Sequence, residues 1–121
     1  MKYLSIGIRA LLTLAFFAAG SAKLLGAEMM VGTFEAVGFG QWFRYLTGII
    51  EFGGAIALWF AATRVYAAAL LGATMVGAVV AHLTVLGPSA VPAVVLGLLL
   101  VAVLYLHRDE VAVATGKVAS T

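Results

Sequence analysis

Four long apolar segments restrict this chain to one broad class of fold. They cover about residues 4–25, 45–62, 65–86 and 91–106, and their lengths are close to that of a helix crossing a bilayer. Of the 121 residues, 64% are hydrophobic and 10% are charged. A soluble domain of this size cannot bury so much apolar surface. We therefore predict an all-α integral membrane protein with a single domain over residues 1–121.

Basic residues predict the direction of the segments. In an antiparallel four-helix bundle, Lys23 and Arg44 lie on one side of the membrane, and the five other basic residues lie on the opposite side. These five are Lys2, Arg9, Arg64, Arg108 and Lys117. Because cytoplasmic borders are enriched in Lys and Arg, both termini are expected in the cytoplasm, in a multi-pass protein of the cell membrane. An alternative is that the first segment is a signal peptide, since Lys2 and Arg9 precede its apolar run.

The connections between the segments have their own patterns. In the linker 26–44, apolar residues recur at helical spacing before Gly38 and Gly40, which predicts a short helix lying in the membrane interface. An irregular loop is the alternative, because Gly32 weakens a helix. We expect a tight turn at residues 63–64, a break at 87–89, and Pro92 in the first turn of the last segment. The tail after this segment is expected to be frayed or bound to the surface.

Small residues predict how the helices pack. Gly53, Ala57 and Ala61 recur every four residues, and so do Ala73, Gly77 and Ala81. Such ridges let helix backbones approach closely in lipid, so we expect them inside the bundle.

Several kinds of chemistry are excluded or unsupported. The formal charge of +2 comes without a basic run, so no nucleic-acid partner is expected. The absence of cysteine excludes disulfides and thiolate metal sites within this chain. No motif for a metal site, a nucleophile or a phosphate loop occurs, so we predict no metal and no covalently bound cofactor.

Glu51 is the most informative single residue. It is a carboxylate within an apolar segment, where an ionised group is costly unless it has a partner or a function. Antiparallel topology puts Lys23 and His82 at the same depth as Glu51, so the three are expected to form a pocket in the outer half of the membrane. Three alternatives to a functional pocket stay open. In the first, the Lys23 side chain extends alone to the lipid headgroups. In the second, the Lys23–Glu51 pair only fixes the helix register, and in the third, His82 is an interfacial side chain.

Taken together, these residues resemble a known family. Gly20-Ser-Ala-Lys23 ends the first segment, the linker ends in Val-Gly-Phe-Gly, Gly48-x-x-Glu51 follows, and Ala81-His82 closes the third segment. Their order and spacing are similar to those of the DoxX-like family of small bacterial membrane proteins, over roughly residues 8–108. The family takes its name from a subunit of a thiosulfate:quinone oxidoreductase.

The resemblance implies a redox-linked role in the membrane, with quinone as the expected ligand. It marks Lys23, Glu51 and His82 as candidates for ligand binding or proton relay, and Gly20 and Gly48 as their packing neighbours. It assigns no catalytic residue, so whether the chain is an enzyme stays open. The lipid bilayer is one expected partner, and a redox protein or a second copy of the chain is another. The alternatives are a non-catalytic scaffold or assembly factor and, less well supported, an oligomeric small-molecule transporter.

Overall fold

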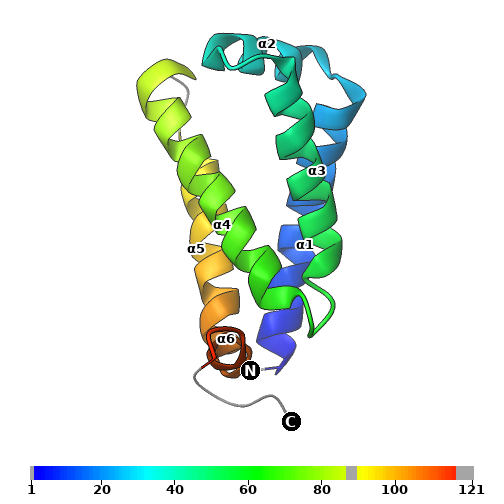
Figure 1. Ribbon diagram of the computed structural model, residues 1–121, viewed down its shortest axis with the longest axis vertical. Helices are drawn as coiled ribbons and strands as arrows, with labels where there is room; N and C mark the ends of the chain where they lie inside the picture. Colours follow the sequence, from blue (N-terminus) through cyan, green and yellow to red (C-terminus); the bar gives the residue numbers. More distant parts are fainter. Residues whose placement is uncertain (1, 87–89, 117–121) are drawn as a thin grey trace.

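The computed structural model describes residues 2–86 and 90–116, and every regular element within these ranges is a helix. The predicted all-α fold class is therefore confirmed. Four long helices run along the molecule, and shorter helices lie across its ends (Figure 1). In chain order the elements are α1 (Lys2–Leu25), α2 (Glu28–Val37), α3 (Gln41–Ala57), α4 (Arg64–Ala81), the π-helix η1 (His82–Leu86), α5 (Val91–Leu106) and α6 (Arg108–Ala114).

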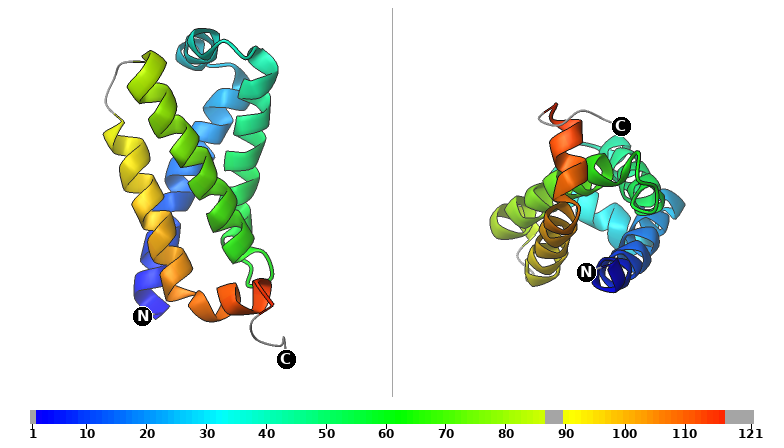
Figure 2. Two further views of the ribbon diagram at one scale, coloured as in Figure 1. Left: turned by 60° about the vertical axis from the view of Figure 1, so that its left-hand side comes forward. Right: turned by 90° about the horizontal axis from the view of Figure 1, so that it is seen from below.

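The long helices alternate in direction along the chain. Helix α1 leads from one end of the molecule to the other, α3 returns, and α4 and α5 repeat this path (Figures 1 and 2). Helix α2 lies across the end at which α1 stops, which we call the α2 end; α6 lies across the opposite end, the α6 end. The most extensive contacts join α1 to α3 and α4 to α5.

The structure supports part of the predicted membrane topology. Two described helices, Lys2–Leu25 and Arg64–Thr84, are long and apolar enough to cross a membrane. A third span is present if α5 and α6, which meet at a bend of 79°, are counted together. Helix α3 has 17 residues, at the lower limit for a span. The fourth span and the cytoplasmic position of the termini stay predictions.

The linker contains the predicted short helix, but its boundaries differ. Helix α2 ends where Gly38 adopts a φ of 88°, a left-handed conformation that glycine takes without steric cost. Gly40 has a φ of 98° and precedes the first residue of α3. The next helix therefore begins at Gln41, four residues before the predicted start, and Arg44 belongs to α3 rather than to the linker.

Three further boundaries test the predicted connections. The tight turn expected at 63–64 is wrong, because α3 ends at Ala57 and residues 58–63 form a longer series of turns. Pro92 lies in the first turn of α5, as predicted. The chain after α5 is not frayed over 108–114, because α6 forms there. The predicted break at 87–89 and the last part of the tail, 117–121, lie outside the described residues.

The core runs through the middle of the molecule and receives side chains from all four long helices. Its fully buried members include Leu12 and Phe16 of α1, Leu71 of α4 and Val103 of α5. Many large apolar side chains point outwards instead; examples are Leu14, Ile49, Val76, Leu98 and Val101. An exposed apolar surface on every long helix suits a protein surrounded by lipid.

Most of the predicted ridge residues do not form the helix contacts, although Ala57 packs against the core and Ala81 is half-buried. Gly53, Ala61, Ala73 and Gly77 are exposed, and a Cβ atom added to either glycine would meet nothing within 4 Å. In a lipid-exposed helix the outer face is as apolar as the inner face, so small-residue spacing alone does not show which face is packed.

Candidate functional site

A buried ion pair joins α1 to α3 near the α2 end. The Lys23 Nζ atom lies 2.6 Å from the Glu51 Oε1 atom, and the two side chains are only 11% and 3% exposed. Lys23 therefore does not extend alone to the headgroups. Because each charge is removed from water, each stabilises the other far more than an exposed pair would. The role of this pair in ligand binding or proton transfer stays a prediction.

Two glycines allow the helices to approach closely enough for this pair to form. A Cβ atom added to Gly20 would lie 2.9 Å from the carbonyl oxygen of Gly48, closer than real Cβ contacts come. A Cβ atom on Gly48 would lie 3.0 Å from the Cβ atom of Lys23. The backbones of α1 and α3 therefore touch one turn from the ion pair. This close contact puts Lys23 and Glu51 within reach of each other.

Arg44 supports the same corner of the molecule, a role that was not predicted from the sequence. It is 5% exposed, and its Nη1 atom donates a hydrogen bond to the carbonyl oxygen of Lys23. Its Nε atom donates to Gln41 at 2.8 Å, and its guanidinium lies 4.3 Å from the ring centre of Tyr45. A cation beside the last carbonyl groups of α1 is stabilised by the helix dipole. The spacing Arg44, Gly48, Glu51 marks one helical face and could have revealed this position.

His82 does not join the pair. It is the first residue of η1, a half-buried position, and its Nδ1 atom is buried without a hydrogen-bond partner. Within residues 2–86 and 90–116 it forms no hydrogen bond or ion pair with Lys23 or Glu51. The structure thus brings together two of the three predicted residues. Helix α2 packs against η1, so His82 lies at the α2 end as expected from its depth.

A second polar cluster, which was not predicted from the sequence, lies at the α6 end. The Ser5 Oγ atom lies 2.6 Å from His107 Nε2 and accepts a hydrogen bond from Arg9 Nε at 3.0 Å. The Glu110 Oε2 atom accepts a hydrogen bond from Arg64 Nη1 at 2.9 Å and lies 3.1 Å from His107 Nδ1. We call these five residues the inner cluster. They link α1, α4 and α6 with the end of α5.

Both arginines of the inner cluster also bind the end of α3. Arg9 Nη1 and Arg64 Nε donate to the carbonyl oxygen of Leu58, at 3.3 and 3.1 Å. The guanidinium of Arg9 lies 4.8 Å from the ring centre of Trp59, an arrangement that favours a cation over the aromatic face. The basic residues at the same predicted depth are a signal for this cluster as well as for the orientation of the helices.

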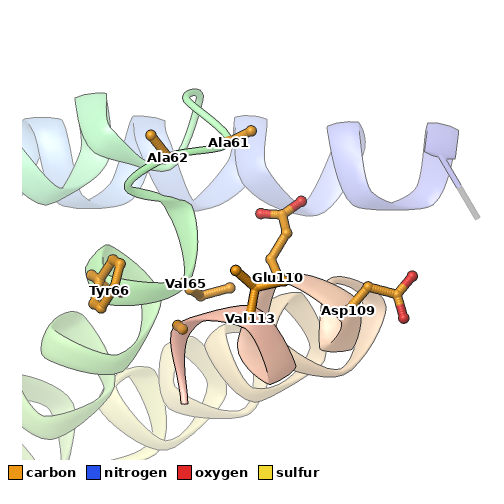
Figure 3. Close-up of a pocket in the computed structure, with 8 residues that line it drawn as sticks. Ala61, Ala62, Val65, Tyr66, Asp109, Glu110 and Val113 are labelled. Atoms are coloured by element: carbon orange, nitrogen blue, oxygen red, sulfur yellow. The ribbon is translucent and has the colours of Figure 1, made fainter. Parts of the chain in front are cut away.

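Two surface pockets of the described residues are lined by residues other than Lys23, Glu51 and His82. One, of about 510 Å³, lies between the start of α4 and α6 (Figure 3). Its lining residues are Ala61, Ala62, Val65, Tyr66, Asp109, Glu110, Val113 and Ala114. The other, of about 360 Å³, is an apolar groove between α3 and α4. Among the described residues, no three His, Cys, Asp or Glu side chains are grouped to hold a metal ion.

Comparison with known proteins identifies a family. The family model described as the DoxX-like family matches residues 8–104, which is most of the chain. Neither the curated proteins nor the solved structures include a significant match.

Proposed function

This chain belongs to the DoxX-like family, and on that premise we propose that it is a membrane-embedded subunit of a redox-linked process in which Glu51 exchanges protons with a quinone. The observation that carries the proposal is the buried ion pair. Glu51 is the only acidic residue in the four long helices, and its sole ionic partner within the described residues is Lys23. A carboxylate in such a place is expensive to keep ionised, so a function is a reasonable cause for its presence.

The proposed roles follow from the chemistry of each group. Oxidation of a quinol releases two electrons, which pass to a redox partner, and two protons. Glu51 accepts the two protons one after the other and releases the first before it takes the second, and Lys23 stabilises the carboxylate before each transfer. His82, whose Nδ1 atom has no hydrogen-bond partner, is the candidate for passing protons to the surface at the α2 end.

Quinone binding to the purified protein in lipid nanodiscs tests the proposal. A short-tailed quinone should bind to the wild type, and Glu51→Gln should weaken binding by about tenfold, because a charged hydrogen-bonding group is lost. His82→Ala should leave binding intact and slow proton exchange with the surface. Glu35→Gln is the matched control, since Glu35 is an exposed carboxylate on α2. Equal affinities of wild type and Glu51→Gln would remove Glu51 from the mechanism.

A second candidate function is a non-catalytic scaffold or assembly factor. One specific observation favours it: the ion pair lies one turn from the tight Gly20–Gly48 contact, where it can fix the register of α1 and α3. If the protein is a scaffold, Glu51→Gln lowers its stability, and quinone binds neither to the wild type nor to Glu51→Gln. The same experiment, with unfolding measured beside binding, therefore separates the two functions.

A further inference from the structure

The inner cluster contains more positive than negative charge. Arg9 and Arg64 are both largely removed from water, and Glu110 is the carboxylate that faces them. Arg9 is 6% exposed, and its partners within the described residues are neutral: the Ser5 hydroxyl, the Leu58 carbonyl and the Trp59 ring. One carboxylate therefore faces two buried cations, and it forms an ion pair with Arg64 rather than with Arg9. Because a buried cation without an anion in direct contact is costly, the cluster has capacity for a further negative group.

Glu110 uses only part of its hydrogen-bonding capacity in this cluster. Its Oε2 atom lies beside both Arg64 and His107, whereas its Oε1 atom is buried and has no hydrogen-bond partner. A carboxylate with one unpaired buried oxygen is an incomplete partner for two guanidinium groups. A phosphate group offers more acceptor oxygens and matches the planar donor groups of arginine.

Helix α6, which carries Glu110, is weakly attached to the rest of the molecule. It has seven residues, none of them buried, and it turns away from α5 by 79°. Its first turn has no side-chain cap. Little apolar burial opposes its movement, so the bonds of Glu110 with Arg64 and His107 are the main attachment.

A pocket lies directly beside this attachment. It separates α6 from the start of α4, and Glu110 is part of its lining (Figure 3). Most of its wall is apolar, with Val65, Tyr66 and Val113 among the lining residues. Basic residues and an exposed tyrosine are typical of the border between hydrocarbon and headgroups. Glu110 connects this pocket to the inner cluster, because its Oε2 atom accepts a hydrogen bond from Arg64 at 2.9 Å.

We propose that the inner cluster is a binding site for the phosphate group of an anionic phospholipid, and that α6 is a displaceable cover in which Glu110 occupies the place of this phosphate. When the lipid binds, its phosphate pairs with Arg64 and Arg9, and Glu110 moves with α6 into water. The lipid comes from the leaflet at the α6 end. This site is separate from the Lys23–Glu51 pair, so the proposal does not depend on quinone binding.

The position of α6 provides the first test. The chain contains no cysteine, so cysteines introduced at Ala61 and Val113, on opposite walls of the pocket, can each carry a spin label. In phosphatidylcholine nanodiscs we expect one short distance between the labels, and in phosphatidylglycerol nanodiscs a second, longer distance. Glu110→Gln should give the longer distance in both lipids, because the attachment is weakened. Unchanged distances in phosphatidylglycerol would overturn the proposal.

A matched control separates the attachment from general charge effects. Glu35→Gln removes the same charge from an exposed position on α2, at the other end of the molecule and outside the pocket. It should behave like the wild type in both lipids. Opening of α6 in Glu35→Gln would show that the net charge of the protein, rather than Glu110, controls the helix, and would overturn the proposal.

Lipid retention provides the second test. Native mass spectrometry should show that Arg64→Gln retains phosphatidylglycerol about tenfold less well than the wild type, because a charge-assisted contact is lost. Arg108→Gln is the control, since Arg108 is exposed and its contacts within the described residues are with the carbonyl oxygen and the ring of Tyr105. Equal losses in the two variants would overturn a specific site. Opening of α6 by inorganic phosphate alone, in phosphatidylcholine, would show that the ligand is free phosphate and not a lipid. The spin-label test does not require Arg64→Gln to fold.

Discussion

Replacing Gly20 by alanine should separate α1 from α3 and weaken the protein. The added Cβ atom would lie 2.8 Å from the backbone nitrogen of Phe52 and 2.9 Å from the carbonyl oxygen of Gly48. Both are backbone atoms, which cannot rotate away as the end of a side chain can. The helices must therefore move apart, and the Lys23–Glu51 pair, one turn further along, must lengthen.

The magnitude follows from the type of contact. Overpacking of a well-packed interior typically costs about 1–3 kcal/mol of unfolding free energy. Gly53 is the matched control, because it lies on the same helix pair and its added Cβ atom would meet nothing within 4 Å. A Gly→Ala change at an unstrained position stabilises by about 0.4–1 kcal/mol, since the unfolded chain loses freedom. The two variants should therefore differ by about 2 kcal/mol.

Reversible unfolding of the detergent-solubilised protein by sodium dodecyl sulfate, followed by far-ultraviolet circular dichroism, measures this difference. We expect Gly20→Ala to unfold at a lower denaturant fraction than the wild type, and Gly53→Ala at an equal or higher one. Equal stability of the two variants would refute the reasoning, because it would mean that α1 and α3 do not touch at Gly20 in the membrane protein.

Three further predictions concern neighbouring contacts. Glu51→Leu should destabilise by about 3–5 kcal/mol because it leaves a buried unpaired lysine, and adding Lys23→Met should recover most of this loss; a double-mutant cycle in the same unfolding assay measures the coupling. Phe16→Ala, at a fully buried core position, should cost about 3–5 kcal/mol, whereas Leu14→Ala, at a lipid-facing position, should change the unfolding free energy little; similar losses in both would contradict the assigned core. Arg44→Gln should speed amide hydrogen exchange in the last turn of α1, because Arg44 donates to the carbonyl of Lys23; unchanged exchange there would argue against this contact.

Much of the fold was predictable because it depends on local properties of the chain. Long apolar runs predict helices, Gly38 and Pro92 mark helix ends, and antiparallel order gives the depth of each residue. Depth was enough to predict that Lys23 and Glu51 lie at the same level. It was not enough for His82, because depth does not specify the rotation of a helix about its axis, and the expected bond to Glu51 is absent from the described residues.

The helical class, the membrane environment and the family can be predicted from the sequence alone, since they follow from apolar length, from composition and from a few spaced residues. The folded molecule is needed to show which small residues pack, that α6 turns away from α5, and that Ser5 and His107 meet although 102 positions separate them. Lipid accounts for this difference, because it removes the contrast between the inner and outer faces of a helix. Without that contrast, the rotation of each helix depends on contacts with its neighbours, and such contacts exist only in the folded molecule.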